Sequence, residues 1–192
     1  MVITNEMMID VTTPYIGATV SGVDLSEPLS PPTVSAIESA LLEHQVLFFR
    51  DQDISLEAQA RLGGYFGDLH IHPSAKPIDG VKGVIKIHAD DTTHRVAGDS
   101  WHTDVSCDPL PPMLSILRLH TVPDSGGDTL FSSMYAAYDA LSESMKQYLE
   151  GLEALHDGAP NYRDRNRRLG IDDSHKTYPQ AVHPVIRTHP KS

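Results

Sequence analysis

The chain has 192 residues, of which 40% are hydrophobic, and its 15 Lys and Arg against 26 Asp and Glu give a formal net charge of −11. This acidic balance argues against a general nucleic-acid binder and a polybasic membrane anchor, because the long-range field repels both. A single cysteine, Cys107, excludes an internal disulfide and a cysteine-rich zinc site. No run approaches the roughly 20 apolar residues of a membrane-spanning helix, and residues 1–12 carry acidic groups but no Lys or Arg, unlike a signal peptide. The sequence therefore predicts a cytoplasmic protein.

The first third of the chain alternates short strands with capped helices. Residues 15–23 are typical of short β structure bounded by glycines. Ser30, followed by two prolines, predicts the start of a helix that gives way near His44 to a buried strand over 46–49. A second helix is expected over 55–65, with Ser55 as its N-cap.

The remainder mixes strand and helix signals. Residues 84–88 and 113–119 are predicted strands, and 125–128 a turn. One long helix is expected over 134–155, and β-like structure over 183–190. Because these elements mix without regular βαβ alternation, the pattern favours an α+β fold.

Two His-x-Asp sequences carry the most specific chemistry. They are His102-Thr103-Asp104 and His88-Ala89-Asp90. On a strand, residues i and i+2 leave the same face, so an imidazole and a carboxylate can converge on one cation. With a distant third His they would form the facial triad of non-heme Fe(II) oxygenases. This composition gives about one such pair by chance, so the spacing alone is weak evidence.

The sequence around the first pair is more specific. WHTDVS at 101–106, two prolines at 111–112 and SGGDTL at 125–130 resemble the taurine/2,4-D dioxygenase (TauD/TfdA) family of Fe(II)- and 2-oxoglutarate-dependent oxygenases. Segments 15–25, 44–52, 66–73 and 183–190 are similar to further family blocks, in the family's order. Within the family the chain is most similar to the taurine dioxygenase branch.

The resemblance implies a set of site residues. His102 and Asp104 match two of the three iron ligands, and Thr129 matches the threonine that binds a carboxylate of 2-oxoglutarate. His72 matches a histidine that contacts the substrate sulfonate, and Tyr162 lies where the family places an aromatic residue over the substrate. His88 and Asp90 fall outside the ligand motif and are expected to be a solvated pair.

The resemblance also implies the fold. It predicts a double-stranded β-helix (jelly roll) core with flanking helices, formed by a single domain over 1–192 that is incomplete at its C-terminus and lacks its last strands. In the family, the third ligand His and an Arg that binds 2-oxoglutarate lie downstream of the block at 183–190. His183 and His189 belong to that block and are not expected to replace the third ligand. We expect an isolated 192-residue product to aggregate or need a partner chain, and association as a homo-oligomer stays open.

The implied activity uses Fe(II), 2-oxoglutarate and O2 to hydroxylate a small anionic substrate, with release of succinate and CO2. Ala75 and Gly98 stand where the taurine enzyme has a tyrosine and an asparagine that hold the substrate. A related sulfonate, an alkyl sulfate ester or another small anion is therefore expected rather than taurine. The basic cluster 163–168 could attract such an anion, although a solvated surface loop is the simpler interpretation.

Two other classes of function compete with this interpretation. The first is a catalytically silent family remnant that acts as a binding or regulatory protein. The second is a zinc-dependent hydrolase that uses His102, Asp104 and another His, but no nearby residue in the sequence is typical of a dedicated general base. The DNA downstream of codon 192 distinguishes the two cases. An in-frame continuation that encodes a His and an Arg would indicate a fragment of an oxygenase, whereas a stop codon would favour the silent remnant.

Overall fold

A computed structural model describes residues 7–72, 75, 77–93, 98 and 100–192. Residues 1–6 of the N-terminal segment and Pro73 of the 66–73 block lie outside the described residues. The chain divides into a first unit (1–66, 116–149 and 188–192) and a second unit (67–115 and 150–187). None of the helices formed by the described residues has the length and apolar character needed to span a bilayer.

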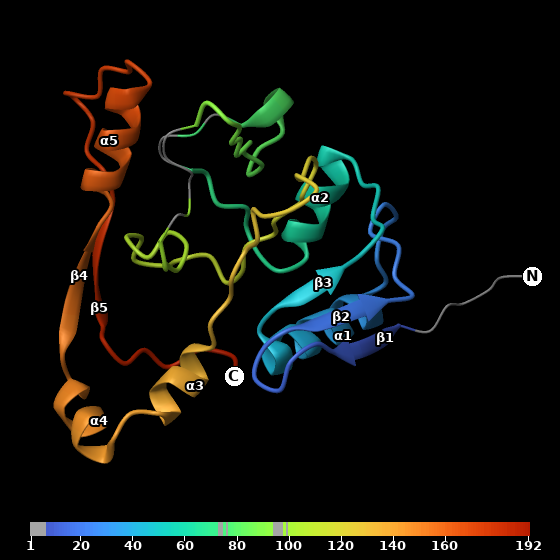
Figure 1. Cartoon of the computed structure of the whole chain (residues 1–192), viewed down its shortest axis with the longest axis horizontal. Coiled ribbons are helices and arrows are strands. Elements are labelled where there is room, and N and C mark those ends of the chain that lie inside the picture. Colours follow the sequence, from blue (N-terminus) through green and yellow to red (C-terminus); the bar gives the residue numbers. More distant parts are fainter. Residues whose placement is uncertain (1–6, 73–74, 76, 94–97, 99) are drawn as a thin grey trace, which may run out of the picture. The chain divides into compact units, whose positions relative to one another are not determined.

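A three-stranded sheet begins the first unit (Figure 1). β1 (Met8–Val11) pairs antiparallel with β2 (Ala18–Ser21), and β2 pairs parallel with β3 (Leu47–Phe49). Gly17 precedes β2 with a φ of 96°, and a Cβ there would lie 3.2 Å from the ring of Phe48. Only glycine tolerates both this backbone conformation and this close approach.

The two predicted N-caps start the helices of this unit. α1 (Pro31–His44) follows Ser30, whose hydroxyl accepts the amide of Thr33, and α2 (Leu56–Gly64) follows Ser55, whose hydroxyl accepts the amide of Ala58. These bonds satisfy amides that have no partner inside a helix. The inner face of α2 then joins the core of the unit, which contains Leu25, Ile54, Ala58 and Leu62.

The predicted long helix over 134–155 is wrong. The structure has α3 (Met134–Asp139), α4 (Glu143–Leu149) and then β4 (Glu153–Asp157). The hydroxyl of Ser142 accepts the amide of Met145 and so starts a new helix. Gly151, at a φ of 77°, ends the helical segment, because this left-handed conformation cannot continue an α-helix.

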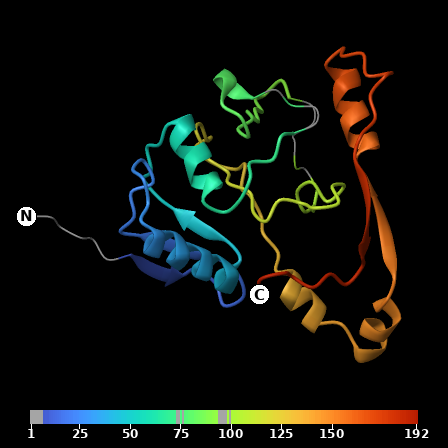
Figure 2. The ribbon, with the colours of Figure 1, turned by 180° about the vertical axis from the view of Figure 1, so that it is seen from behind.

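The second unit contains a two-stranded ribbon (Figures 1 and 2). β4 pairs antiparallel with β5 (Gln180–Pro184), and α5 (Ala159–Arg168) follows β4 at one end of the ribbon. A 3₁₀ turn, η1 (Ile78–Gly80), lies in the preceding segment. His156 and His183 share the inner face of the ribbon, whereas Leu155 and Val182 are exposed on the outer face.

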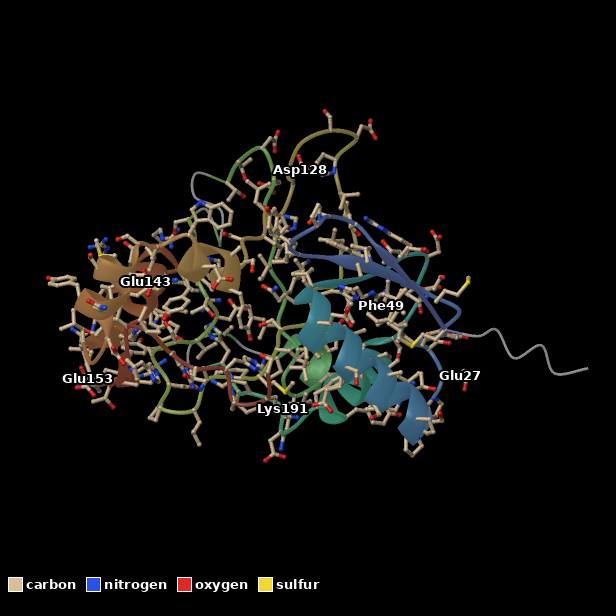
Figure 3. All side chains as sticks on the ribbon, turned by 90° about the horizontal axis from the view of Figure 1, so that it is seen from below. Glu27, Phe49, Asp128, Glu143, Glu153 and Lys191 are labelled. Carbon is tan, nitrogen blue, oxygen red and sulfur yellow. The ribbon has the colours of Figure 1, made fainter. Side chains whose placement is uncertain are left out.

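The α+β prediction is confirmed, and several strand boundaries are corrected. Residues 84–88 and 113–119 pair with no other described segment, so they are not strands. β5 covers only the start of the predicted 183–190 segment. The predicted turn at 125–128 is supported by Gly126 and Gly127, both with positive φ, on the loop that carries Asp128 (Figure 3). The described strands form one three-stranded and one two-stranded sheet.

Candidate functional site

His102 and Asp104 lie together in the second unit, with His102 Nε2 3.4 Å from Asp104 Oδ1. The motif does not lie on a strand, because residues 104–107 form a turn. Val105 holds a φ of 51° in that turn. A β-branched residue in the left-handed region costs about 1–3 kcal/mol, and such strain is concentrated at functional sites. The turn thus brings the imidazole and the carboxylate together without strand geometry.

A backbone hydrogen bond fixes the tautomer of His102. Its Nδ1 donates to the carbonyl of Ser100 at 2.8 Å. Since a carbonyl can only accept, the proton of the neutral ring is on Nδ1 and the lone pair is on Nε2. Nε2 is the atom that faces Asp104, so the ring presents its metal-binding nitrogen toward the carboxylate.

The carboxylate of Asp104 is oriented in a similar way. Ser115 donates its hydroxyl to Asp104 Oδ2 at 2.5 Å, which leaves Oδ1 directed at His102. Metal ligands characteristically have such hydrogen-bond partners, which hold the ligand atom in place. Sequence reasoning missed Ser115, because nothing in the local pattern marks a serine 11 residues downstream.

The second His-x-Asp pair is engaged differently. His88 Nε2 lies 3.3 Å from Asp90 Oδ2, but Asp90 Oδ1 accepts hydrogen bonds from the amide and hydroxyl of Thr92 and from the hydroxyl of Thr93. These bonds, those from Thr92 first, lower the pKa of Asp90 to about 2. Asp90 therefore stabilises its own turn, and both residues of this pair are exposed, as the solvated-pair prediction states.

His72 and Tyr162 form a second contact in the same unit. Their rings meet edge to face at 85°, with the centroids 5.4 Å apart. The amide of Ala75 donates to His72 Nδ1 at 2.9 Å, so the neutral ring carries its proton on Nε2. Burial is the largest of the effects that lower the pKa of His72. The ring is therefore a neutral hydrogen-bond donor near pH 7.

Tyr162 comes from α5 and is packed on two further sides. Its hydroxyl lies 3.7 Å from Cys107 Sγ, and its ring lies against Tyr178, with 5.2 Å between the centroids and the planes tilted by 36°. Burial raises the pKa of the Tyr162 hydroxyl, so the group stays protonated. The two substrate-side predictions, His72 and Tyr162, are thus in contact with each other.

The turn that follows Asp104 is tied to the ribbon. His183 Nε2 donates to the carbonyl of Asp108 at 3.0 Å, and His156 Nδ1 lies 3.0 Å from Ser106 Oγ. The carboxylate of Asp108 in turn pairs with His70 at 2.7 Å. His183 therefore supports the turn through a hydrogen bond. The sequence did not indicate that His156 contacts Ser106 or that His183 contacts Asp108, because these pairs lie 50 and 75 residues apart.

The other predicted positions are distributed as follows. Thr129 belongs to the first unit and is exposed, whereas the other four predicted site residues belong to the second unit. His189, also in the first unit, accepts the amides of Lys191 and Ser192 at its Nδ1. The described residues contain no group of three His, Cys, Asp or Glu side chains arranged to hold a metal.

The His102–Asp104 pair fits two ligands of a divalent cation. Adjacent ligands around an octahedral ion, each at about 2.1 Å, lie about 3 Å apart, close to the observed 3.4 Å. One imidazole and one carboxylate belong to the donor set of non-heme Fe(II) oxygenases. The chemistry of the pair is thus compatible with two of the three ligands of that class of protein.

Comparisons with known proteins identify the family. The family described as "Taurine catabolism dioxygenase TauD, TfdA family" matches residues 9–192. The chain belongs to this family. It is 33% identical to an alkylsulfatase of Acinetobacter baylyi and 35% identical to an alpha-ketoglutarate-dependent sulfate ester dioxygenase of Pseudomonas putida, over 98% and 92% of this chain. The crystal structure of a taurine dioxygenase from Burkholderia xenovorans matches 97% of the chain with a TM-score of 0.76 and 30% identity.

The chain is shorter than these relatives. The matched region spans 61% of the alkylsulfatase, and 60% of both the sulfate ester dioxygenase and the taurine dioxygenase. The family match covers residues 9–192. Because the chain spans less than two thirds of these relatives, their activity is considered for this chain only as a proposal.

Proposed function

We propose that this chain carries the His-x-Asp iron site and part of the substrate site of an Fe(II)- and 2-oxoglutarate-dependent dioxygenase. The observation that carries the proposal is the orientation of His102 and Asp104, whose hydrogen bonds to Ser100 and Ser115 direct Nε2 and Oδ1 toward each other. Both His-x-Asp pairs are exposed and have similar His–Asp distances, but Asp90 is held by Thr92 of its own turn, whereas Asp104 is held by Ser115, 11 residues away.

The proposed reaction hydroxylates a carbon atom next to a sulfur oxyanion. 2-Oxoglutarate loses CO2 and becomes succinate with one oxygen atom of O2, and the other atom enters the substrate C–H bond. Bound iron would supply the activation of O2. The hydroxylated product would break down to an aldehyde and release sulfate or sulfite. Relatives named as an alkylsulfatase and a sulfate ester dioxygenase support a sulfate ester as the substrate class, with a sulfonate as the related alternative.

The chain's own residues would bind and orient the reactants. His72 would donate Nε2–H to the anionic group, and the ring of Tyr162 would cover the apolar part of the substrate. The hydroxyl of Thr129 would donate to a carboxylate of 2-oxoglutarate. The complete fold is proposed to be a jelly roll with flanking helices, supported by the similarity to the taurine dioxygenase structure.

The test uses the complete gene product, expressed with any in-frame sequence that follows codon 192. With Fe(II) and ascorbate, it should consume 2-oxoglutarate in the presence of short alkyl sulfates or alkanesulfonates and release sulfate or sulfite. Asp104→Asn should reduce turnover at least about 100-fold, whereas the matched Asp90→Asn should leave it unchanged. If the protein binds the metal but consumes 2-oxoglutarate with none of these substrates, a catalytically silent binding or regulatory protein is favoured instead.

The predictions of an incomplete domain and of a cytoplasmic location are tested separately. An in-frame continuation that encodes a further His and Arg would support the first. Fractionation of the source cells, followed by detection of the protein, would check the second.

A further inference from the structure

Three histidines from different segments of the second unit hold the turn that contains the candidate ligand carboxylate. His183 Nε2 donates to the carbonyl of Asp108 at 3.0 Å, and His156 Nδ1 lies 3.0 Å from Ser106 Oγ. His70 Nε2 lies 2.7 Å from Asp108 Oδ2. We call these three histidines the histidine clamp. All of its contacts fall just beyond the His-x-Asp motif.

The β4–β5 ribbon supports two members of the clamp. The rings of His156 and His183 meet edge to face, with 5.3 Å between the centroids and 72° between the planes. Both side chains lie on the inner face of the ribbon, and His183 is buried. A buried N–H that loses its acceptor costs free energy, so the fold favours the conformation of the turn that keeps the bond from His183.

The turn held by the clamp contains a backbone conformation that valine avoids. Val105 has a φ of 51°, and its carbonyl accepts the amide of Asp108 at 3.0 Å, which closes the turn. A β-branched residue keeps this left-handed conformation only where the surrounding structure fixes it. The clamp supplies such contacts, because two of its three interactions are with Asp108, at the end of the turn.

A change in the backbone at Val105 would move the segments on its two sides relative to each other. His102 and Asp104 precede Val105, so their spacing would be kept. Ser115 follows it, so its hydroxyl would be displaced from Asp104 Oδ2. The clamp therefore acts on the candidate iron site through the bond between Ser115 and Asp104.

We propose that His183 is a positioning residue of the candidate iron site. The histidine clamp holds Val105 in its strained conformation and so keeps Asp104 within reach of Ser115. This inference rests on the proposed function for the role of Asp104 as a ligand, and it adds residues outside the motif to that site. His183, which the sequence did not favour as a ligand, thereby holds a ligand in place.

The first test follows the turn itself and needs no metal. In the complete gene product, exchange of the Asp108 amide with solvent is measured by NMR, because this amide is bonded to Val105 only while the turn is closed. His183→Leu removes the donor and fills the buried position, whereas His183→Gln retains an N–H donor. Ala181→Gly is the matched control, since it weakens β5 at a buried position on the same face without removing a clamp contact.

We expect His183→Leu to accelerate exchange of the Asp108 amide at least about tenfold, and Ala181→Gly to change it less than about threefold. His183→Gln should restore most of the protection. Adding Val105→Gly to His183→Leu should also restore protection, because glycine adopts the left-handed conformation without steric cost. That double variant regains no contact at position 183, so its recovery would report relief of strain rather than repair of the ribbon.

The second test measures the metal site of the same variants by titration with Co(II), followed by absorption spectroscopy. His183→Leu should weaken Co(II) binding about tenfold, and adding Val105→Gly should restore most of the affinity. His183→Leu combined with Ser115→Ala should bind Co(II) no more weakly than Ser115→Ala alone, since both substitutions remove the same bond to the ligand. A general loss of structure would instead add to the effect of Ser115→Ala.

Four results would overturn the inference. They are unchanged exchange of the Asp108 amide in His183→Leu, equal acceleration by Ala181→Gly, no recovery with Val105→Gly, and additive losses of Co(II) affinity with Ser115→Ala. Each of them would show that His183 does not act through the strained turn.

A milder variant keeps the test decisive if His183→Leu does not fold. Ser106→Ala removes the hydroxyl that His156 contacts, and unchanged exchange of the Asp108 amide in this variant would overturn the clamp. The proposed iron site fails separately, if Asp104→Asn leaves Co(II) affinity unchanged. The exchange result is unaffected in that case, so the two proposals can fail independently.

Discussion

Ser115 donates its hydroxyl to Asp104 Oδ2, and this bond turns the other carboxylate oxygen toward His102. The relationship joins two residues that are 11 positions apart and belong to no common motif. It makes the orientation of the candidate metal ligand depend on a side chain outside the His-x-Asp sequence. The consequence can be measured with single substitutions.

Ser115→Ala is expected to weaken metal binding about tenfold, because the carboxylate loses the hydroxyl that orients it. Ser100→Ala is the matched control. Ser100 holds His102 through its backbone carbonyl, so removal of its hydroxyl should leave affinity unchanged. Titration of the chain with Co(II), followed by absorption spectroscopy, measures both variants. Equal affinities for the wild type and Ser115→Ala would contradict the assigned role.

The stability of the chain should fall in mild acid because of His72. Burial first, and then the charges of Arg165 and His70, lower its pKa below 6.5, while Asp104 opposes them. The unfolded chain therefore binds more protons than the folded one between the lowered pKa and 6.5, so stability rises with pH through this window. The stability that the neutral His72 ring contributes is fully present above pH 6.5, and it is lost as the pH falls from 6.5 through the folded-state pKa.

Urea unfolding between pH 8 and pH 5 tests this dependence. His72→Gln should lose less of its free energy of unfolding over that range than the wild type. His88→Gln, at an exposed histidine, should follow the wild-type curve. A steeper loss in His72→Gln would show that the sign is wrong.

Gly158→Ala should disturb the contact between His72 and Tyr162. A Cβ at position 158 would lie 2.7 Å from Tyr162 Cε2 and 2.9 Å from Cys107 Sγ, so the tyrosine ring must move. Overpacking of this kind costs about 1–3 kcal/mol. Gly64→Ala, in α2 with no atom within 4 Å of the added Cβ, should keep or raise stability by up to about 1 kcal/mol. Denaturant unfolding gives both values, and the His72 ring signals report the displacement.

Asn166→Ala should destabilise the second unit by about 1–3 kcal/mol. Asn166 is 1% exposed and donates to Asp173 and to the hydroxyl of Tyr178, so its loss removes two hydrogen bonds and leaves a gap at a buried position. Asn161→Ala, on the exposed side of the same helix, should change stability by less than about 0.5 kcal/mol. Similar losses in the two variants would mean that the Asn166 hydrogen bonds contribute nothing specific.

The parts of the fold that sequence reasoning predicted correctly are those set by neighbouring residues. Ser30 and Ser55 cap helices because a side-chain oxygen three residues before an amide can reach it in any fold. The helix predicted over 134–155 was wrong because its apolar spacing continued across Ser142 and Gly151, where a cap and a left-handed residue interrupt it. Residues 113–119 have strand-like composition, but a strand also needs a partner segment, which composition does not specify.

The sequence by itself determined the family, through motifs whose order along residues 9–192 is specific, and it named His102, Asp104, His72 and Tyr162. The sequence also separated Asp104 from Asp90, but only the tertiary structure showed which side chains hold the candidate ligands in place. Ser115 meets Asp104 across 11 residues of sequence, and His183 meets the carbonyl of Asp108 across 75. Such hydrogen bonds form only when the chain folds, because no local pattern brings residues so far apart in the sequence together.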